Sequence, residues 1–263
     1  MRLDRQKLLG HLTNAEERLI GARALDAADK ALQLGEPVAT GFLDPSGREI
    51  AQGVLGAIPS VRTRAYGGYT QAEYQILMVF PEYYLIELLD PALYAVQVSG
   101  DFPANSVNHG DFLGAILATG LQRDRVGDII LTPNGCQAVV GKQALVTLTT
   151  HLRQVHRVPV LVEEIDLEQL MVTPQRVKNL STTVASLRID AVAAFGFGMS
   201  RTKMAREIKG GRLKLNWRVI IDPAQSVAVG DVISMRGRGR VTVDEIKGET
   251  RKGRIALALT RTI

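Results

Sequence analysis

The chain has 263 residues and a net charge of +5, and 46% of its residues are hydrophobic against 22% charged, the composition of a folded globular protein of about two or three domains. The lone cysteine, Cys136, excludes an internal disulfide and a thiolate metal cluster, and with four histidines we expect no metal site. No signal-like segment begins the chain and no apolar run approaches the ~20 residues of a membrane span, so we expect a soluble protein of the cytoplasm, or of the plastid stroma if the chain is organellar.

The basic charge is concentrated near the C-terminus. Residues 186–263 carry 16 Lys and Arg against 7 Asp and Glu, a balance of +9, whereas residues 1–185 carry 16 against 20, a balance of −4. A basic segment on an otherwise slightly acidic chain is typical of contact with a phosphate backbone. A solvated basic face on a stable domain would give the same count, so the charge alone leaves both interpretations open.

Residues 1–90 are expected to form a mixed, mainly helical N-terminal domain. Leucines and alanines at helical spacing cover residues 3–31, and either Thr13 or Asn14, each followed three residues later by Glu, caps the second helix. Gly35 is expected to end that helix.

The rest of this domain is expected to combine turns with one short helix. Residues 42–47 are typical of a turn, residues 50–55 of a short helix, and residues 76–80 form an apolar run. Between the short helix and the apolar run, two cations, Arg62 and Arg64, stand beside two aromatic residues, Tyr66 and Tyr69. These side chains would suit stacking on unpaired bases, and a turn packed by its own tyrosines explains them equally well.

Residues 91–166 are expected to form a ferredoxin-like (RRM-like) domain, because strands and helices follow one another in the order β-α-β-β-α-β. The predicted elements are 93–98, 109–119, 129–132, 137–140, 142–155 and 158–162. RNA-recognition motifs share this order but stack bases on aromatic residues of the two central strands, where this chain has only Tyr94. We therefore interpret the domain as scaffold or protein-contact surface.

Residues 167–185 are expected to be a linker, because they contain Pro174 and the polar run Ser181-Thr-Thr183. We find no set of catalytic residues elsewhere in the sequence. The glycines before Lys142 resemble a phosphate loop, but their spacing is wrong and Gln143 replaces the hydroxyl that would hold Mg²⁺. A nucleophile elbow and a zinc-binding His-Glu-x-x-His helix are both lacking. We expect a protein that is not an enzyme and needs no cofactor.

Residues 186–263 show the clearest pattern: a short helix, a Gly-rich break, a second helix capped by Ser200, and strands joined by tight turns. On a helical wheel Met204, Ala205 and Ile208 share one arc. The opposite arc holds Lys203, Arg206 and Lys209, and Arg201 lies in the first turn at the edge of the apolar arc. Arg212 and Lys214 alternate with leucines, so both cations should point outward from the next strand. One face of the segment should pack and the other should be free to contact phosphates.

This segment resembles the S4 RNA-binding domain in Arg188-Ile-Asp190, in Ser200-Arg201, and in residues 211–216 and 229–233. The family usually has Gly after the Asn of the hairpin turn, because a type I′ turn needs positive φ at both central residues. This chain has Trp217 there. Either the turn changes type or the site tolerates strain of about 1–2 kcal/mol.

The charge pattern and the resemblance together indicate which residues contact RNA. We predict contacts from Arg188, Ser200, Arg201, Lys203, Arg206, Lys209, Arg212, Lys214, Asn216, Trp217, Arg236, Arg238 and Arg240. Glycines between the last three arginines would let the backbone approach a phosphate closely. For Trp217 two roles stay open: stacking on a base or sugar, and packing of the turn.

Further motifs extend the resemblance over nearly the whole chain, including Phe42-Leu-Asp-Pro45, Asp111-Phe-Leu-Gly-Ala115 and Val126-Gly-Asp-Ile129. The chain is similar to the YlmH-like family of bacterial S4-domain proteins, whose photosynthetic branch is labelled photosystem II S4 domain protein. Tyr74 and residues 108–110 depart from the family pattern. The resemblance implies binding to rRNA or tRNA on the large ribosomal subunit during quality control of stalled translation. We expect the protein to be a monomer.

The expected fold class is therefore α+β, with an N-terminal mixed helical segment (1–90), a ferredoxin-like domain (91–166), a linker (167–185) and a C-terminal S4 domain (186–263). Two other functions compete with non-catalytic RNA binding. S4 domains are often fused to RNA-modifying enzymes, although no pseudouridine-synthase or methyl-donor motif is found in residues 1–185. A photosystem II assembly factor that acts through protein contacts is the third interpretation.

Overall fold

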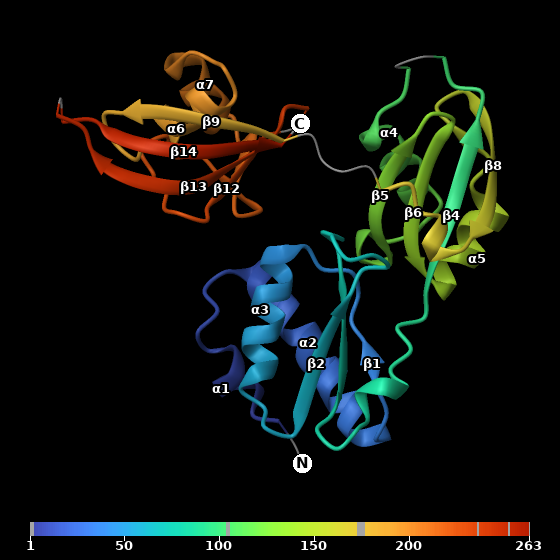
Figure 1. Cartoon of the computed structure of the whole chain (residues 1–263). Helices are drawn as coiled ribbons and strands as arrows, with labels where there is room; N and C mark the ends of the chain where they lie inside the picture. The colour runs from blue at the N-terminus through green and yellow to red at the C-terminus, as the bar shows by residue number, and fades with distance from the viewer. Residues whose placement is uncertain (1–2, 104–105, 173–176, 236, 252, 263) are drawn as a thin grey trace. The chain divides into compact units, whose positions relative to one another are not determined.

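The structure is a computed structural model that describes residues 3–103, 106–172, 177–235, 237–251 and 253–262. The chain divides into two compact units, Met1–Val172 (unit 1) and Thr173–Ile263 (unit 2). Both units combine helices with antiparallel sheets, which confirms the α+β class (Figure 1). Within the described residues, no helix is both long enough and apolar enough to cross a bilayer.

The N-terminal part of unit 1 packs three helices against a small sheet (Figure 1). The helices are α1 (Arg5–Leu9), α2 (Ala15–Leu34) and α3 (Pro45–Gly56), and the antiparallel strands are β1 (Val38–Ala39), β3 (Ile76–Pro81) and β2 (Val61–Tyr66), in that order across the sheet. Asn14, not Thr13, caps α2 by accepting a hydrogen bond from the backbone N–H of Glu17 at 2.8 Å. Gly35 ends α2 at φ 72°, as predicted.

The turn predicted at residues 42–47 is wrong for its second half, because α3 already begins at Pro45. Asp44 caps the helix by accepting a hydrogen bond from Gly47 N at 2.8 Å, and a proline at the first helical position loses no hydrogen bond. The predicted helix at 50–55 is therefore the second half of a longer one. Strand β2 was not predicted. Its exposed Arg62 and Arg64 alternate with less exposed residues, as in an edge strand, but they were interpreted as part of a cation–aromatic cluster.

The middle part of unit 1 has the predicted element order. Strands β4 (Leu93–Gly100), β5 (Val126–Thr132), β6 (Gly135–Gly141) and β8 (Val158–Ile165) alternate with helices α4 (His109–Ala118) and α5 (Lys142–His151). With the short β7 (Gln154–Val155) they form an antiparallel sheet in the order β5-β6-β4-β8-β7. Helix α5 ends at His151 rather than at the predicted Val155, because Gln154 and Val155 pair with β8.

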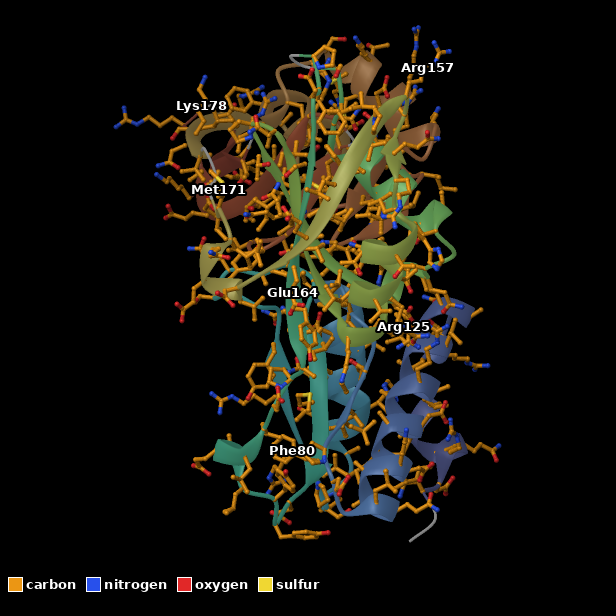
Figure 2. All side chains as sticks on the ribbon, turned by 90° about the vertical axis from the view of Figure 1, so that its right-hand side faces the viewer. Phe80, Arg125, Arg157, Glu164, Met171 and Lys178 are labelled. Atoms are coloured by element: carbon orange, nitrogen blue, oxygen red, sulfur yellow. The ribbon has the colours of Figure 1, made fainter. Side chains whose placement is uncertain are left out.

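The two parts of unit 1 share a buried joint. Phe42, Ile76 and Met78 from the N-terminal part form one buried cluster with Val139 of β6, on the sheet face that lies away from α4 and α5. Phe80 belongs to the same cluster and lies within the N-terminal part, away from the middle sheet (Figure 2). The short 3-10 helix η3 (Leu167–Gln169) adds to the cover through Leu167. Two further 3-10 helices, η1 (Ile86–Leu88) and η2 (Arg123–Arg125), connect the strands.

Unit 2 places two helices on one face of a six-stranded sheet (Figure 1). The helices are α6 (Ile189–Gly196) and α7 (Arg201–Lys209), and the strands run in the order β11-β10-β12-β13-β14-β9. Their bounds are β9 (Val177–Val184), β10 (Leu213–Leu215), β11 (Arg218–Ile220), β12 (Val232–Met235), β13 (Gly239–Glu249) and β14 (Ile255–Thr262). Ile189, Phe197, Met204 and Ile208 form the helical side of the core.

The predicted linker, 167–185, is corrected at both ends. Residues 167–169 form η3 in unit 1, and residues 177–184 form β9, which pairs with β14 from Val184↔Ile255 to Val177↔Thr262. Strand β9 is an edge strand with a mostly exposed, polar face, which is why its sequence resembles a connector.

Candidate nucleic-acid interface

Helix α7 presents a cationic face to solvent. The hydroxyl of Ser200 caps the helix by accepting a hydrogen bond from Lys203 N at 3.3 Å, as predicted. Met204 and Ile208 are fully buried against the sheet, whereas Lys203, Arg206 and Lys209 are exposed. The predicted division of the helix into a packing face and a free face is confirmed. Contact with RNA stays a prediction for these residues.

Strand β10 extends the exposed basic surface by one lysine and one paired arginine. Leu213 and Leu215 are buried, and Lys214 between them is exposed. Arg212 also points outward, but its Nε lies 2.5 Å from Oε2 of Glu207 on α7. The outward direction of both cations is as predicted, while the ion pair with Glu207 was not foreseen. It ties the start of the strand to the helix.

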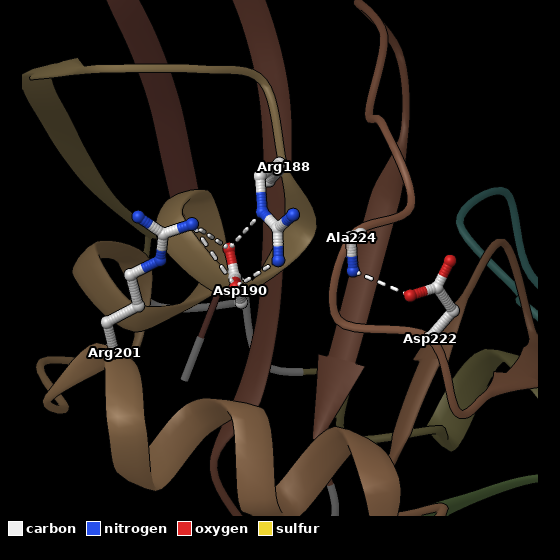
Figure 3. A network of polar contacts seen from close by, with 5 residues as sticks. All are labelled: Arg188, Asp190, Arg201, Asp222 and Ala224. Carbon is white, nitrogen blue, oxygen red and sulfur yellow. Dashed lines mark hydrogen bonds and ion pairs between the residues drawn. The ribbon is translucent and has the colours of Figure 1, made fainter.

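Arg188 and Arg201 are held by one buried carboxylate, that of Asp190 (Figure 3). Arg188 donates from Nε at 3.3 Å and from Nη2 at 2.9 Å, one bond to each carboxylate oxygen. Arg201 reaches the same two oxygens through Nη2 alone, at 3.0 and 3.3 Å. The Asp190 side chain is 6% exposed, against 38% for Arg188 and 51% for Arg201. Both guanidinium groups thus stay accessible to a partner while Asp190 fixes their positions.

The electrostatics of this network favour the ionised carboxylate. Burial by itself would raise the pKa of Asp190, but hydrogen bonds and charge from Arg188 and Arg201 outweigh it and hold the pKa below the ordinary value. Nearby, Asp222 accepts a hydrogen bond from Ala224 N at 2.8 Å (Figure 3), and Ile189 N donates to the carbonyl of Gln225 at 2.8 Å. The bond from Ile189 fastens the start of α6 to the segment that follows β11, and the bond between Asp222 and Ala224 closes a turn within that segment.

The hairpin turn between β10 and β11 keeps the geometry that favours glycine. Leu215 pairs with Arg218, so Asn216 and Trp217 are the two central residues, and both have positive φ, 49° and 65°. The turn therefore has the positive φ values of type I′ and tolerates the strain of a tryptophan at its second position, about 1–2 kcal/mol. Trp217 is half-buried, and the guanidinium carbon of Arg240 lies 5.9 Å from its ring centre.

Asn216 serves the fold. Its Nδ2 donates to Oδ1 of Asp231 at 2.8 Å, and its Oδ1 accepts from Val232 N at 2.9 Å. Because both ends of the amide are engaged, the side chain fixes the turn against β12. The predicted RNA contact of Asn216 is untested, but the fold already uses the polar atoms it would need.

The last group of predicted residues lies at and before the start of β13. Arg238 is exposed, and its carbonyl accepts a hydrogen bond from Nη2 of Arg261 at 3.4 Å. Arg240 pairs with Ser234 across the sheet and lies near Trp217. Arg236 lies outside the described residues.

In unit 1 the aromatic cluster proposed for base stacking is mostly engaged in packing. The hydroxyl of Tyr69 donates to Asp128 at 2.6 Å, and Tyr66 and Tyr69 pack against the buried joint. Burial, followed by the bond to Asp128, raises the pKa of Tyr69. Arg64 lies 5.6 Å from the ring centre of Tyr66. These contacts favour the packing interpretation for both tyrosines.

Sequence reasoning missed the carboxylates that organise these sites. Asp128 also accepts hydrogen bonds from Glu73 N at 2.7 Å and Tyr74 N at 3.0 Å, which joins the two parts of unit 1. Asp190 stands in the Arg-x-Asp pattern on which the S4 resemblance rests, and the proximity of a second arginine could not be inferred without knowing how α6 and α7 pack.

Comparisons with known proteins match both parts of unit 1 and most of the chain. Residues 16–84 match the family model described as "YlmH, N-terminal", and residues 90–169 match the one described as "Putative RNA-binding domain in YlmH". The second description stands against our expectation that residues 91–166 act only as scaffold or protein-contact surface. The ribosome-associated protein quality control protein P2 of Bacillus subtilis (strain 168) is 36% identical over 222 residues, which are 84% of this chain and 86% of that protein.

A solved structure, that of the cell division protein ylmH from Streptococcus pneumoniae, is 21% identical with a TM-score of 0.50. The match covers 60% of this chain and 96% of that one. At this identity the likeness concerns the fold alone. The family models and the relative from Bacillus subtilis agree with the motifs found in the sequence, and the chain belongs to the YlmH family.

Proposed function

We propose that this chain is a non-catalytic RNA-binding protein that acts on the ribosome, and that unit 2 makes its main RNA contacts. The observation that carries the proposal is the set of exposed cations Lys203, Arg206, Lys209 and Lys214, which stand on elements whose opposite side is buried. Rigid elements with one packed face hold such cations in fixed positions, as recognition of a phosphate backbone requires. Arg188 and Arg201, oriented by Asp190, add two guanidinium groups that suit phosphate oxygens.

The arrangement of each unit supports a specific fold assignment. We assign unit 2 to the S4 type, because α6, α7 and the β10–β11 hairpin occur in the order of the motif residues. We assign the middle part of unit 1 to the ferredoxin-like type, because its element order and the sheet order β5-β6-β4-β8 are those of that fold.

The ribosome is the proposed place of action. Support comes from the Bacillus subtilis relative, which is named as a ribosome-associated quality control protein, and from the family model that names an RNA-binding domain. We infer that the ligand is rRNA of the large subunit or tRNA bound on it. The protein would act as a monomer in quality control of stalled translation.

The proposal is tested by the salt dependence of RNA affinity. If Lys203 and Arg206 each neutralise one phosphate, the double variant Lys203→Gln/Arg206→Gln should flatten the slope of log affinity against log salt by about 1.4 to 1.8, since each contact releases about 0.7–0.9 counterion. Full-length protein would be titrated with fluorescein-labelled bulk tRNA and with purified large-subunit rRNA across a salt series.

The control variant Lys7→Gln/Lys30→Gln removes the same charge from exposed positions on α1 and α2 of unit 1. It should leave the slope unchanged. Equal slopes for the wild type and a folded Lys203→Gln/Arg206→Gln variant would mean that the basic face of α7 is merely solvated, and the proposal would fail.

The absence of catalysis is part of the proposal and needs its own test. RNA incubated with the full chain, with and without a methyl donor, should show no new modified uridine or ribose by mass mapping. One reproducible modification would favour an RNA-modifying enzyme instead.

A further inference from the structure

An open groove of about 900 Å³ lies in the middle part of unit 1, between α4 and the segment that joins α5 to β8. One wall is the side of α4 that carries Gly110, Gly114 and Ala118, spaced four residues apart and therefore on one helical face. At Gly114 an added Cβ would meet no heavy atom within 4 Å. This side of α4 therefore carries only small residues, and a ligand can approach the helix backbone closely.

The opposite wall carries one charged side chain, that of Arg153, and two histidines. His151, Arg153 and His156 line it, all exposed, and exposed Arg157 follows at the tip of the β7–β8 hairpin (Figure 2). Nη1 of Arg153 donates to the carbonyl of Thr149 at 3.0 Å, so this arginine is anchored at the end of α5. Among the described residues that line the groove, Asp111 is the one carboxylate, and it lies 3.0 Å from Nε2 of His156. The charge of Asp111 offsets that of Arg153 within the groove, and Arg157 beside it adds a second exposed cation.

The hairpin tip is held in an unusual conformation. Val155 pairs with Val158, so His156 and Arg157 form a two-residue turn, and His156 has φ 53°. A β-hairpin favours glycine at such a position. The contact between His156 and Asp111 of α4 ties the turn to the other wall, which fixes the width of the groove.

The sheet surface that RNA-recognition domains use is closed in this protein. Val139 of β6 is fully buried in the joint with the N-terminal part. The side-chain amide of the neighbouring Gln137 donates to the carbonyl of Gln169 at 3.1 Å and accepts from Met171 N at 2.6 Å. Further along the sheet, β8 exposes Leu161 and Glu163, which offer neither a cation nor an aromatic ring. Stacking of bases on the centre of this sheet is therefore blocked.

We propose that the groove between α4 and residues 151–157 is a second RNA-contact site, which binds the phosphodiester backbone rather than base edges. The inference rests on the proposed function and extends it from unit 2 to unit 1. Arginine guanidinium groups on one wall would pair with phosphate oxygens, and the small residues on the α4 wall would leave room for the sugar. Such a site adds affinity without reading sequence.

The groove is tested in the full chain by two changes that act on opposite walls. Arg153→Gln/Arg157→Gln removes two exposed cations, and the salt slope for fluorescein-labelled bulk tRNA or large-subunit rRNA should flatten by about 1.4 to 1.8 for two lost phosphate contacts. Gly114→Glu adds a carboxylate to the α4 wall and should weaken binding. Its matched control, Gly114→Ala, leaves the groove open, favours the helix, and should bind like the wild type.

The outcomes separate this inference from the proposed function. If Lys203→Gln/Arg206→Gln flattens the slope while Arg153→Gln/Arg157→Gln, shown to be folded by circular dichroism, does not, the groove inference is overturned and the proposed function stands. If only the groove variant flattens the slope, the groove binds RNA and the proposed role of α7 fails. The groove variant could also lose binding to anionic lipid vesicles while its RNA binding stays unchanged. That result would assign the groove to lipid and would overturn the inference.

Discussion

Unit 1 and unit 2 each contain an aspartate that gathers three or more hydrogen bonds, and the donors differ. Asp128 in unit 1 accepts from the Tyr69 hydroxyl and from two backbone N–H groups, all neutral and partly buried. Asp190 in unit 2 accepts from two arginines that remain substantially exposed. Neutral buried donors make Asp128 a lock between two parts of a fold. Charged exposed donors make Asp190 a support that presents cations to a ligand.

Removal of Asp128 should have the largest effect on stability. In Asp128→Ala the Tyr69 hydroxyl and the N–H groups of Glu73 and Tyr74 lose their acceptor, and an unsatisfied buried donor costs about 1–3 kcal/mol. We expect the free energy of unfolding to fall by about 3 kcal/mol in urea denaturation, with little change in RNA affinity. Asp101→Ala, at an exposed position, should change it by less than about 0.5 kcal/mol. A stable Asp128→Ala variant with weakened RNA binding would mean that Asp128 supports the ligand rather than the fold.

Removal of Asp190 should cost less stability, about 1–2 kcal/mol, because the two arginines released are exposed and can be solvated. The loss should depend on pH. Since the pKa of Asp190 is lower in the folded protein than its ordinary 3.8, its contribution is present above that value and is lost as the pH falls through the lower, folded pKa. The unfolding free energies of the wild type and Asp190→Ala should therefore converge in acid. A gap that stays constant to the lowest pH at which the fold survives would contradict a stabilising role for the ion pairs.

The smallest expected effect concerns the hairpin turn of unit 2. Trp217→Gly removes a positive-φ strain, so the free energy of unfolding should rise by about 1 kcal/mol. The same variant decides the role of the side chain. If Trp217 stacks on a base or sugar, RNA binding should weaken by about 1–3 kcal/mol with an unchanged salt slope. Unchanged binding would leave packing of the turn as its role, and a fall in stability would show that its packing outweighs the strain.

The sequence predicted features that depend on neighbouring residues. The cap at Ser200, the buried Met204 and Ile208, and the element order of residues 93–165 follow from local spacing, and all are present. Prediction from the sequence failed for contacts between residues that are far apart along the chain. Strand β9 pairs with β14, which follows it by more than seventy residues, and no local pattern reveals that pairing. The carboxylate network at Asp190 likewise needs α7 to fold back beside α6 before Arg201 can reach it.

The affinity of Asp190→Ala for RNA tests most directly whether Asp190 presents its two arginines to a ligand. Removal of a carboxylate raises the net charge, so simple electrostatics predicts tighter binding to bulk tRNA or large-subunit rRNA, as expected for Glu245→Ala at an exposed site of the same unit. We predict instead that Asp190→Ala binds more weakly than the wild type, because Arg188 and Arg201 lose their fixed positions, while Glu245→Ala binds equally or more tightly. Equal or tighter binding by a folded Asp190→Ala variant would contradict this role of Asp190.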